Sequence, residues 1–254
     1  MRLGRAAWIG LNTASYICEL VFLGLAIAAQ ISPDWAVYDV TYIGLIDDYN
    51  QLSRSRGLWK QCITNEIVST SYNGQCYPLE NCEEFSSYND KVLPIFLMRH
   101  TINILQIAAI ILVFINIIIT CTILLTACMT PEKIRYRTAQ YAALGGGAAL
   151  WFTGLIYFIS LLIYYENMSQ ENYRLDTELK SARSAWTTIV RENTIYSPGG
   201  MIPMAWSACL LIYAGSIFQL IASLFEKPIK EETITYVETA IEMKTDFINK
   251  ATTS

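Results

Sequence analysis

Cysteines and tryptophans gather in one stretch between the first two apolar segments of the chain. Trp35 and Trp59 lie there together with Cys62, Cys76 and Cys82. Cysteines in a loop form disulfides where the compartment is oxidising, and a tryptophan ring is costly to leave in water because of its large apolar area. The stretch is therefore predicted to be a small extracellular module, stapled by a disulfide and seated against a membrane.

The pairing of these cysteines stays open, because one disulfide uses two of the three and leaves at least one cysteine unpaired. Cys62 is expected to be one partner. Cys82 fits a hairpin centred on the turn signal Asn73-Gly74, since Cys76 would lie too close to that turn to face Cys62. The residues alone do not decide between Cys76 and Cys82.

Catalytic and metal-binding chemistry has little support in the sequence. The single histidine, His100, stands beside Arg99 with no nucleophile or metal-ligand spacing nearby. No phosphate-binding loop is present either. The protein is predicted not to be an enzyme and to hold no metal or cofactor. The net charge of −4 is small and argues against a nucleic-acid partner.

Four apolar segments are long enough to cross a bilayer, in a chain that is 53% hydrophobic. They cover about residues 6–31, 101–127, 139–165 and 202–225. Ala26-Ile27-Ala28 is typical of a signal-peptidase site, but the first segment is longer than a signal core and contains a charge, so we expect it to remain as a span. The sequence predicts one four-span domain, 1–225, in a lipid bilayer.

Basic residues predict the orientation of the spans. Lys133, Arg135 and Arg137 lie in the short connection between spans two and three, and short basic flanks stay in the cytoplasm. Both termini are therefore expected inside, with a cytoplasmic tail over 226–254. The long loops, 32–100 and 166–201, are expected outside.

Glu19 is the only charged residue within the predicted spans. A charged carboxylate in a bilayer is expensive, so the neutral acid is expected, with Asn116 or Tyr213 as a hydrogen-bond partner at similar depth. An ion or proton path is the alternative, but the spans offer no second charge. We therefore favour a role in holding helices together.

Two residues are candidates for covalent modification. Asn167 begins the sequon Asn167-Met168-Ser169 on the outer side, close to the end of span three. Cys128, at the cytoplasmic end of span two, is a candidate for palmitoylation, although it can equally be an ordinary boundary cysteine.

Strands are predicted in the first outer loop over Trp35–Ile43 and Gly57–Ile63, where aromatic and β-branched residues are frequent. Arg54 and Arg56 lie between these stretches and are expected on a solvated strand face. The small residues of 142–149 in span three favour close helix packing within the bundle over a lateral contact face.

The layout resembles the claudin and peripheral-myelin-protein superfamily. The resemblance covers the four spans and the long first loop, with a signature at Trp35, Gly57-Leu58-Trp59, Cys62 and Cys76; weaker similarities are Leu93-Pro94, Arg99, Trp206 and Gly215. It favours Cys76 slightly as the partner of Cys62, because few residues separate the two signature cysteines in the family. It implies a left-handed four-helix bundle capped by an antiparallel sheet, which includes one strand from the second loop and is anchored by both tryptophans of the signature.

The resemblance implies a plasma-membrane protein of lateral cell–cell junctions, septate or tight. Such a protein contributes to a paracellular barrier by self-association within the membrane and across the gap, and with other junction proteins. The alternative is an auxiliary subunit of an ion channel or receptor, or an adhesion or trafficking adaptor. The negative charges of Asp39, Asp47 and Asp48 are offset by basic residues in the same loop. The charge of this loop therefore does not distinguish a barrier from an ion-selective pore. The end of the chain, Thr253-Ser254, lacks the hydrophobic residue that PDZ domains bind.

Overall fold

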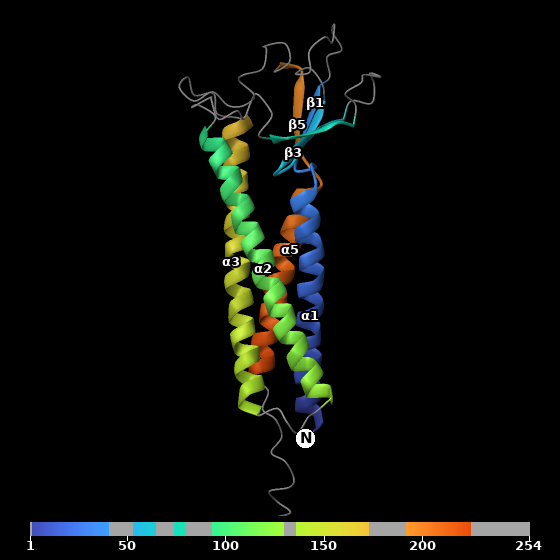
Figure 1. Cartoon of the computed structure of the whole chain (residues 1–254), viewed down its shortest axis with the longest axis vertical. Helices are drawn as coiled ribbons and strands as arrows, with labels where there is room; N and C mark the ends of the chain where they lie inside the picture. The colour runs from blue at the N-terminus through green and yellow to red at the C-terminus, as the bar shows by residue number, and fades with distance from the viewer. Residues whose placement is uncertain are drawn as a thin grey trace, which may run out of the picture.

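The computed structural model describes residues 2–40, 53–64, 74–79, 93–129, 136–172 and 192–224. Within these residues, long helices lie side by side, and a small sheet stands at one end of them (Figure 1). The N-terminus lies at the other end of the helices. We call these ends the sheet end and the opposite end. The predicted tail, 226–254, falls outside the described residues.

The helices confirm the prediction of four membrane spans. They are α1 (Arg2–Ile31), α2 (Leu93–Met129), α3 (Tyr136–Asn172) and α5 (Met201–Leu224). The parts long and apolar enough to cross a membrane are Ala6–Ile31, Leu97–Thr126, Ala139–Ser169 and Met201–Leu224.

Two helices are longer than the predicted spans at the sheet end. α2 begins at Leu93, before residue 101, and α3 continues to Asn172, beyond residue 165. Helix therefore occupies part of both predicted outer loops. The reason is that a helix satisfies its own backbone hydrogen bonds, so it need not end where the apolar residues end.

Glycines on α3 allow close packing against α5. A Cβ at Gly147 would lie 2.9 Å from a side-chain atom of Leu220, and one at Gly154 would lie 3.1 Å from Ile212 and Tyr213. The hydroxyl of Ser216 also donates to the Gly147 carbonyl at 2.8 Å. These contacts agree with the predicted role of the small residues in packing within the bundle.

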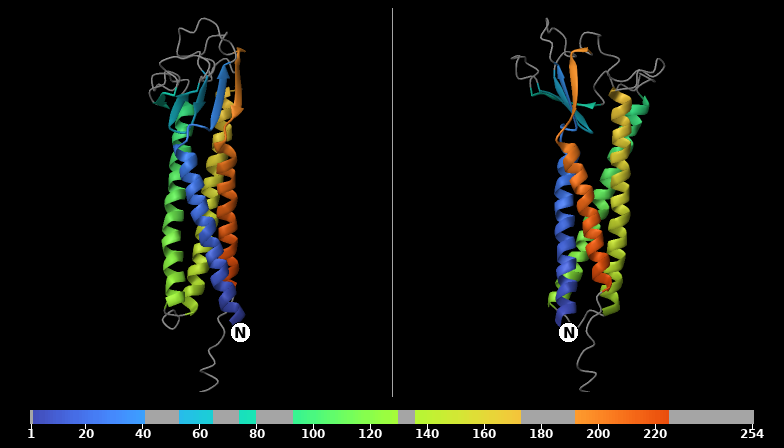
Figure 2. Two further views of the ribbon diagram at one scale, coloured as in Figure 1. Left: turned by 90° about the vertical axis from the view of Figure 1, so that its right-hand side faces the viewer. Right: turned by 180° about the vertical axis from the view of Figure 1, so that it is seen from behind.

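The sheet contains five antiparallel strands in the order β4-β3-β2-β1-β5. Their bounds are β1 (Ala36–Val40), β2 (Arg54–Arg56), β3 (Lys60–Ile63), β4 (Cys76–Pro78) and β5 (Thr194–Pro198). Figure 2 shows β5, which comes from the second loop, beside β1 from the first. The second loop thus supplies one strand, as the resemblance implied.

The second predicted strand is wrong in its first half. Residues 57–59 form a tight turn between β2 and β3, in which the Gly57 N–H donates to the Lys60 carbonyl at 2.9 Å. The prediction of a hairpin centred on Asn73-Gly74 is also wrong. Gly74 does adopt a positive φ of 77°, but it lies two residues before β4, and Cys76 faces Cys62.

One face of the sheet is buried. Alternation along strands places Ala36, Tyr38, Arg54 and Arg56 on this face, and each is at most 1% exposed. The prediction of a solvated face for the two arginines is therefore wrong. The Arg56 guanidinium lies 4.9 Å from the centre of the Tyr38 ring, a cation–π distance, and its Nε donates to Gln61 Oε1 at 2.8 Å. These contacts compensate the burial of the charge.

Candidate functional site

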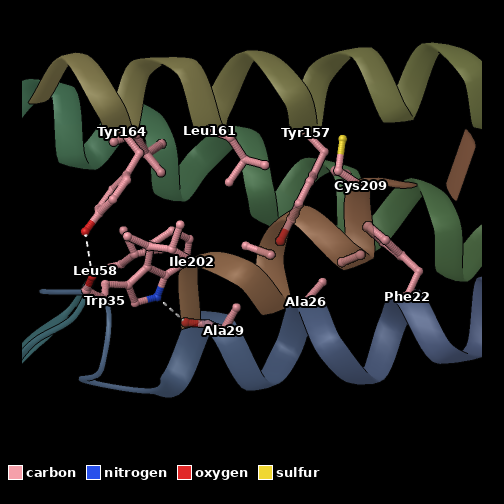
Figure 3. Close-up of a cluster of buried hydrophobic side chains, with 14 of the residues drawn as sticks. Phe22, Ala26, Ala29, Trp35, Leu58, Tyr157, Leu161, Tyr164, Ile202 and Cys209 are labelled. Carbon is pink, nitrogen blue, oxygen red and sulfur yellow. Dashed lines mark hydrogen bonds between the residues drawn. The ribbon is translucent and has the colours of Figure 1, made fainter. Parts of the chain in front are cut away.

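Trp35 ties the sheet to the bundle directly before β1. Its indole N–H donates to the Ala29 carbonyl at the end of α1 at 2.6 Å, and its ring lies 4.7 Å from the Tyr164 ring of α3 (Figure 3). The Trp35 carbonyl accepts from the Tyr164 hydroxyl at 3.1 Å. With 0% exposure, Trp35 confirms the predicted anchor.

Asp34 ties the same segment to α5, which sequence reasoning missed. The Asp34 carboxylate accepts from the Gly200 N–H at 2.9 Å, and its backbone carbonyl accepts from the Met201 N–H at 3.0 Å. These donors lie at the start of α5, where backbone N–H groups lack helical partners. The sequence indicates only that the start of α5 needs a partner, because Gly199-Gly200 before α5 offers no local capping side chain.

The turn Gly57-Leu58-Trp59, which we call the GLW turn, is held by three neighbouring bonds. Arg99 Nη1 donates to the Gly57 carbonyl at 2.6 Å, and Asn103 Nδ2 donates to the Leu58 carbonyl at 3.3 Å. The Trp59 indole N–H donates to Gln30 Oε1 at 2.8 Å. The first two bonds come from one face of α2, and Arg99 is 3% exposed.

Glycine is the only residue type that fits at position 57. A Cβ there would lie 2.3 Å from the Ser32 carbonyl oxygen and 2.8 Å from the Pro33 Cα. Both are backbone atoms that cannot rotate away. The glycine therefore lets the turn approach the end of α1, and Leu58, 2% exposed, then enters the core.

Trp59 does not match the expectation of a second buried anchor. Its side chain is 44% exposed, and it is fixed by the indole bond to Gln30 rather than by burial. The physical reason is the turn itself. Two successive residues of a tight turn point in different directions, so Leu58 enters the core and Trp59 stays at the rim.

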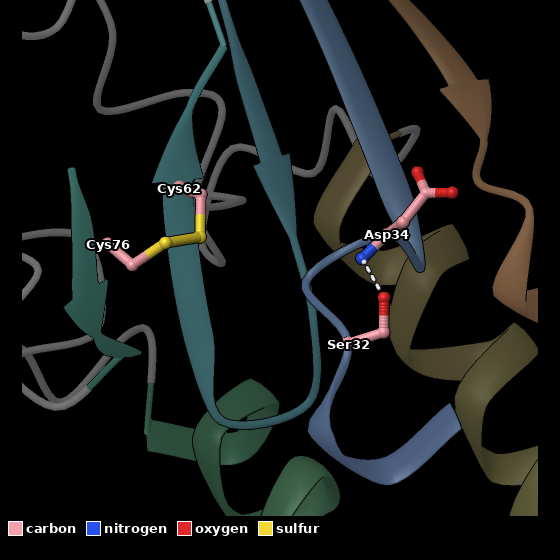
Figure 4. The surroundings of a disulfide bond; sticks show 4 residues. All are labelled: Ser32, Asp34, Cys62 and Cys76. Carbon is pink, nitrogen blue, oxygen red and sulfur yellow. Dashed lines mark hydrogen bonds between the residues drawn. A yellow bond between two sulfur atoms is a disulfide. The ribbon is translucent and has the colours of Figure 1, made fainter. Parts of the chain in front are cut away.

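The disulfide joins Cys62 and Cys76 (Figure 4). The two residues are register partners on β3 and β4, which confirms the favoured pairing. Cys82 lies outside the described residues. Among those that are described, Cys18, Cys121, Cys128 and Cys209 are free thiols.

Glu19 forms the centre of a buried polar hub, composed of Ser15, Glu19, Asn116, Thr120 and Gln219. Asn116 Nδ2, one of the two predicted partners, donates to Glu19 Oε2 at 3.0 Å, and Gln219 Nε2 donates to Oε1 at 3.2 Å. Gln219 also donates to Thr120 at 2.9 Å. The hub joins α1, α2 and α5.

The position of Ser15 indicates which form of Glu19 the hub accommodates. The Ser15 oxygen lies 3.0 Å from Glu19 Oε1 and 2.9 Å from the Gly215 carbonyl, which can only accept. A hydroxyl carries one proton, so it cannot donate to both. A neutral Glu19 that donates to Ser15 satisfies both contacts.

Glu19→Leu is therefore expected to destabilise the bundle more than Glu19→Gln, which keeps a donor for Ser15 and an acceptor for Asn116. Interhelical hydrogen bonds in membrane bundles contribute about 0.6 kcal/mol each on average, so losing the bonds to Asn116 and Gln219 costs about 1 kcal/mol. Unfolding by SDS in mixed micelles measures this difference. Equal losses in the two variants would show that the hub needs a charged carboxylate.

The two candidate modification sites differ in exposure. Asn167 lies within α3 and is 0% exposed, so glycosylation, which stays a prediction, would require the end of this helix to open. Cys128 is an exposed thiol near the end of α2, and its palmitoylation also stays a prediction. Within the described ranges, no group of three or more His, Cys, Asp or Glu residues is placed to hold a metal ion.

Comparison with known families agrees with this architecture. A sequence model described as "PMP-22/EMP/MP20/Claudin tight junction" matches residues 20–225. A search of curated protein sequences finds no match. The matched range contains the Trp35 anchor, the GLW turn, the disulfide and most of the four spans. The chain therefore belongs to the PMP-22/EMP/MP20/claudin family of membrane proteins.

Proposed function

We propose that this claudin-like membrane protein works at lateral cell–cell junctions, where it contributes to a paracellular barrier. The observation that carries the proposal is the sheet at one end of the bundle, which has one face buried and the other open along β1 and β5. On the open face, Asp39 and Ser197 are exposed, and Ile195 is 59% exposed.

The proposed barrier forms by self-association, both within one membrane and across the gap between two cells. Ile195 lies on β5, an edge strand of the sheet, and an exposed apolar residue at a sheet edge favours protein contact. The charges of Asp39 and Lys60 balance on the described open face, so a second copy meets no net repulsion there. Both termini are proposed to be cytoplasmic, which places the sheet outside.

The test uses dispersed cells that express the tagged protein and are then allowed to touch. We expect enrichment only where two expressing cells meet, and a reduced leak of tracer across a sheet of these cells. Ile195→Asp should lower this enrichment at unchanged surface amount, because it places a charge at the contact. Ile195→Val is the matched control and should behave as the unmodified protein.

Two outcomes would contradict the proposal. Uniform surface distribution together with co-purification of an ion channel or receptor would favour the auxiliary-subunit function. Enrichment at borders where only one cell expresses the protein would show that pairing with a second copy across the gap is not required.

A further inference from the structure

Hydrogen-bond chemistry determines which way the Gln30 and Gln106 amides face below the GLW turn. The Trp59 indole N–H can only donate, so the Gln30 atom that it reaches at 2.8 Å is the oxygen. Gln30 Nε2 therefore turns to Gln106, and it donates to Gln106 Oε1 at 2.6 Å. Because the Gln106 oxygen faces Gln30, the Gln106 amide nitrogen must point away from Gln30. That nitrogen is buried, with no partner among the described residues, and Gln106 is 0% exposed.

The same reasoning determines the orientation of Asn103. The Leu58 carbonyl can only accept, so the Asn103 atom that lies 3.3 Å from it is the nitrogen. Asn103 Oδ1 therefore points elsewhere. It is buried as well, has no partner within the described part of the chain, and belongs to a residue that is 3% exposed.

These two buried atoms complement each other. One is a donor and the other is an acceptor, and they belong to residues three apart on α2. Such residues are neighbours on a helix surface, with Cβ atoms about 5–6 Å apart. A single molecule that both accepts and donates, placed between the two side chains, satisfies both atoms with two hydrogen bonds of ordinary length, about 2.8–3.0 Å.

We propose that one buried water molecule bridges Gln106 Nε2 and Asn103 Oδ1. It closes a ring of hydrogen bonds that starts at the Trp59 indole, passes through Gln30, Gln106, the water and Asn103, and ends at the Leu58 carbonyl. The ring therefore begins and ends in the GLW turn.

The chemistry of the site selects water over other occupants. A cation would be repelled by the amide N–H, and an anion by the amide oxygen. The near-complete burial of both residues leaves no route for a lipid hydroxyl with its chain attached. Buried waters typically satisfy such pairs, with two to four protein partners each.

The ring has a consequence for Trp59. The ring links Trp59 to an asparagine that it does not touch, because Asn103 holds the water that completes the partners of Gln106. The site thus couples α1, α2 and the GLW turn in one network, and hydrogen bonds in a closed network strengthen one another.

Proton-detected solid-state NMR of the full-length protein tests the proposal. The protein is labelled with ¹⁵N-glutamine and placed in perdeuterated lipids, so that polarisation starting at the water signal reaches an amide only from water. We expect a water cross-peak at the Gln106 side-chain amide.

Asn103→Leu should abolish the cross-peak at Gln106, because the water then loses one of its two partners. Asn103→Ser, which is smaller and polar, is the second variant in case the leucine variant does not fold. No water signal at Gln106 in the unmodified protein would overturn the proposal. So would a signal that persists unchanged in a folded Asn103→Leu variant.

Discussion

Truncation of Trp35 to alanine is expected to lower the free energy of unfolding by about 3–5 kcal/mol. The ring is 0% exposed, packs on Tyr164 and donates to the Ala29 carbonyl, so its loss leaves a cavity where the sheet meets the bundle. Folded proteins are stable by only about 5–15 kcal/mol. Most of the variant should therefore fail to reach the cell surface.

Trp59→Ala is the matched control for this prediction. It removes the same side chain from the same region, but from a site that is 44% exposed, so the smaller loss of buried area predicts a smaller effect. Thermal unfolding of the purified variants in detergent, together with surface biotinylation in cells, measures both. If Trp59→Ala proves as damaging as Trp35→Ala, burial is not what makes Trp35 important.

Removal of the disulfide is expected to cost about 2–4 kcal/mol, because the bond restricts the unfolded chain. β4 is an edge strand in which Cys76 and Pro78 are exposed, so little apolar burial holds it to β3. Without the bond we expect β4 to separate from the sheet first.

Three variants distinguish the disulfide from local side-chain effects. Cys62→Ala, Cys76→Ala and the double variant should lose similar stability, because each removes the same bond. Cys209→Ala serves as the control, since this buried cysteine is a free thiol. Additive losses in the double variant, or peptide mapping that finds Cys62 alkylated in surface protein, would contradict the bond.

Several properties follow from the sequence alone because their physical causes are local. A span of the membrane requires an apolar stretch of sufficient length, which the sequence shows directly. The Cys62 disulfide was predicted from a thiol placed in a loop outside the spans, and the burial of Trp35 was inferred from its residue type and the family signature. The interhelical role of Glu19 follows from the cost of a charge in lipid, and depth alone made Asn116 and Tyr213 the two candidate partners.

Other properties were decided by the tertiary structure, because they depend on segments that are distant in the sequence. The turn at Gly57 brings Leu58 into the core and leaves Trp59 at the rim. The register of β3 and β4 selects Cys76, and Arg56 is buried because the fold stacks it on Tyr38.

The sequence thus determined which residues prefer to leave water and which need a partner. Only the tertiary structure decided which partner each of them received. Residue type sets the free energy of transfer and the number of donors and acceptors, which are properties of one side chain. The Asp34 contact with α5 and the bonds from α2 to the GLW turn join residues that are distant along the chain, and no local pattern encodes those pairs.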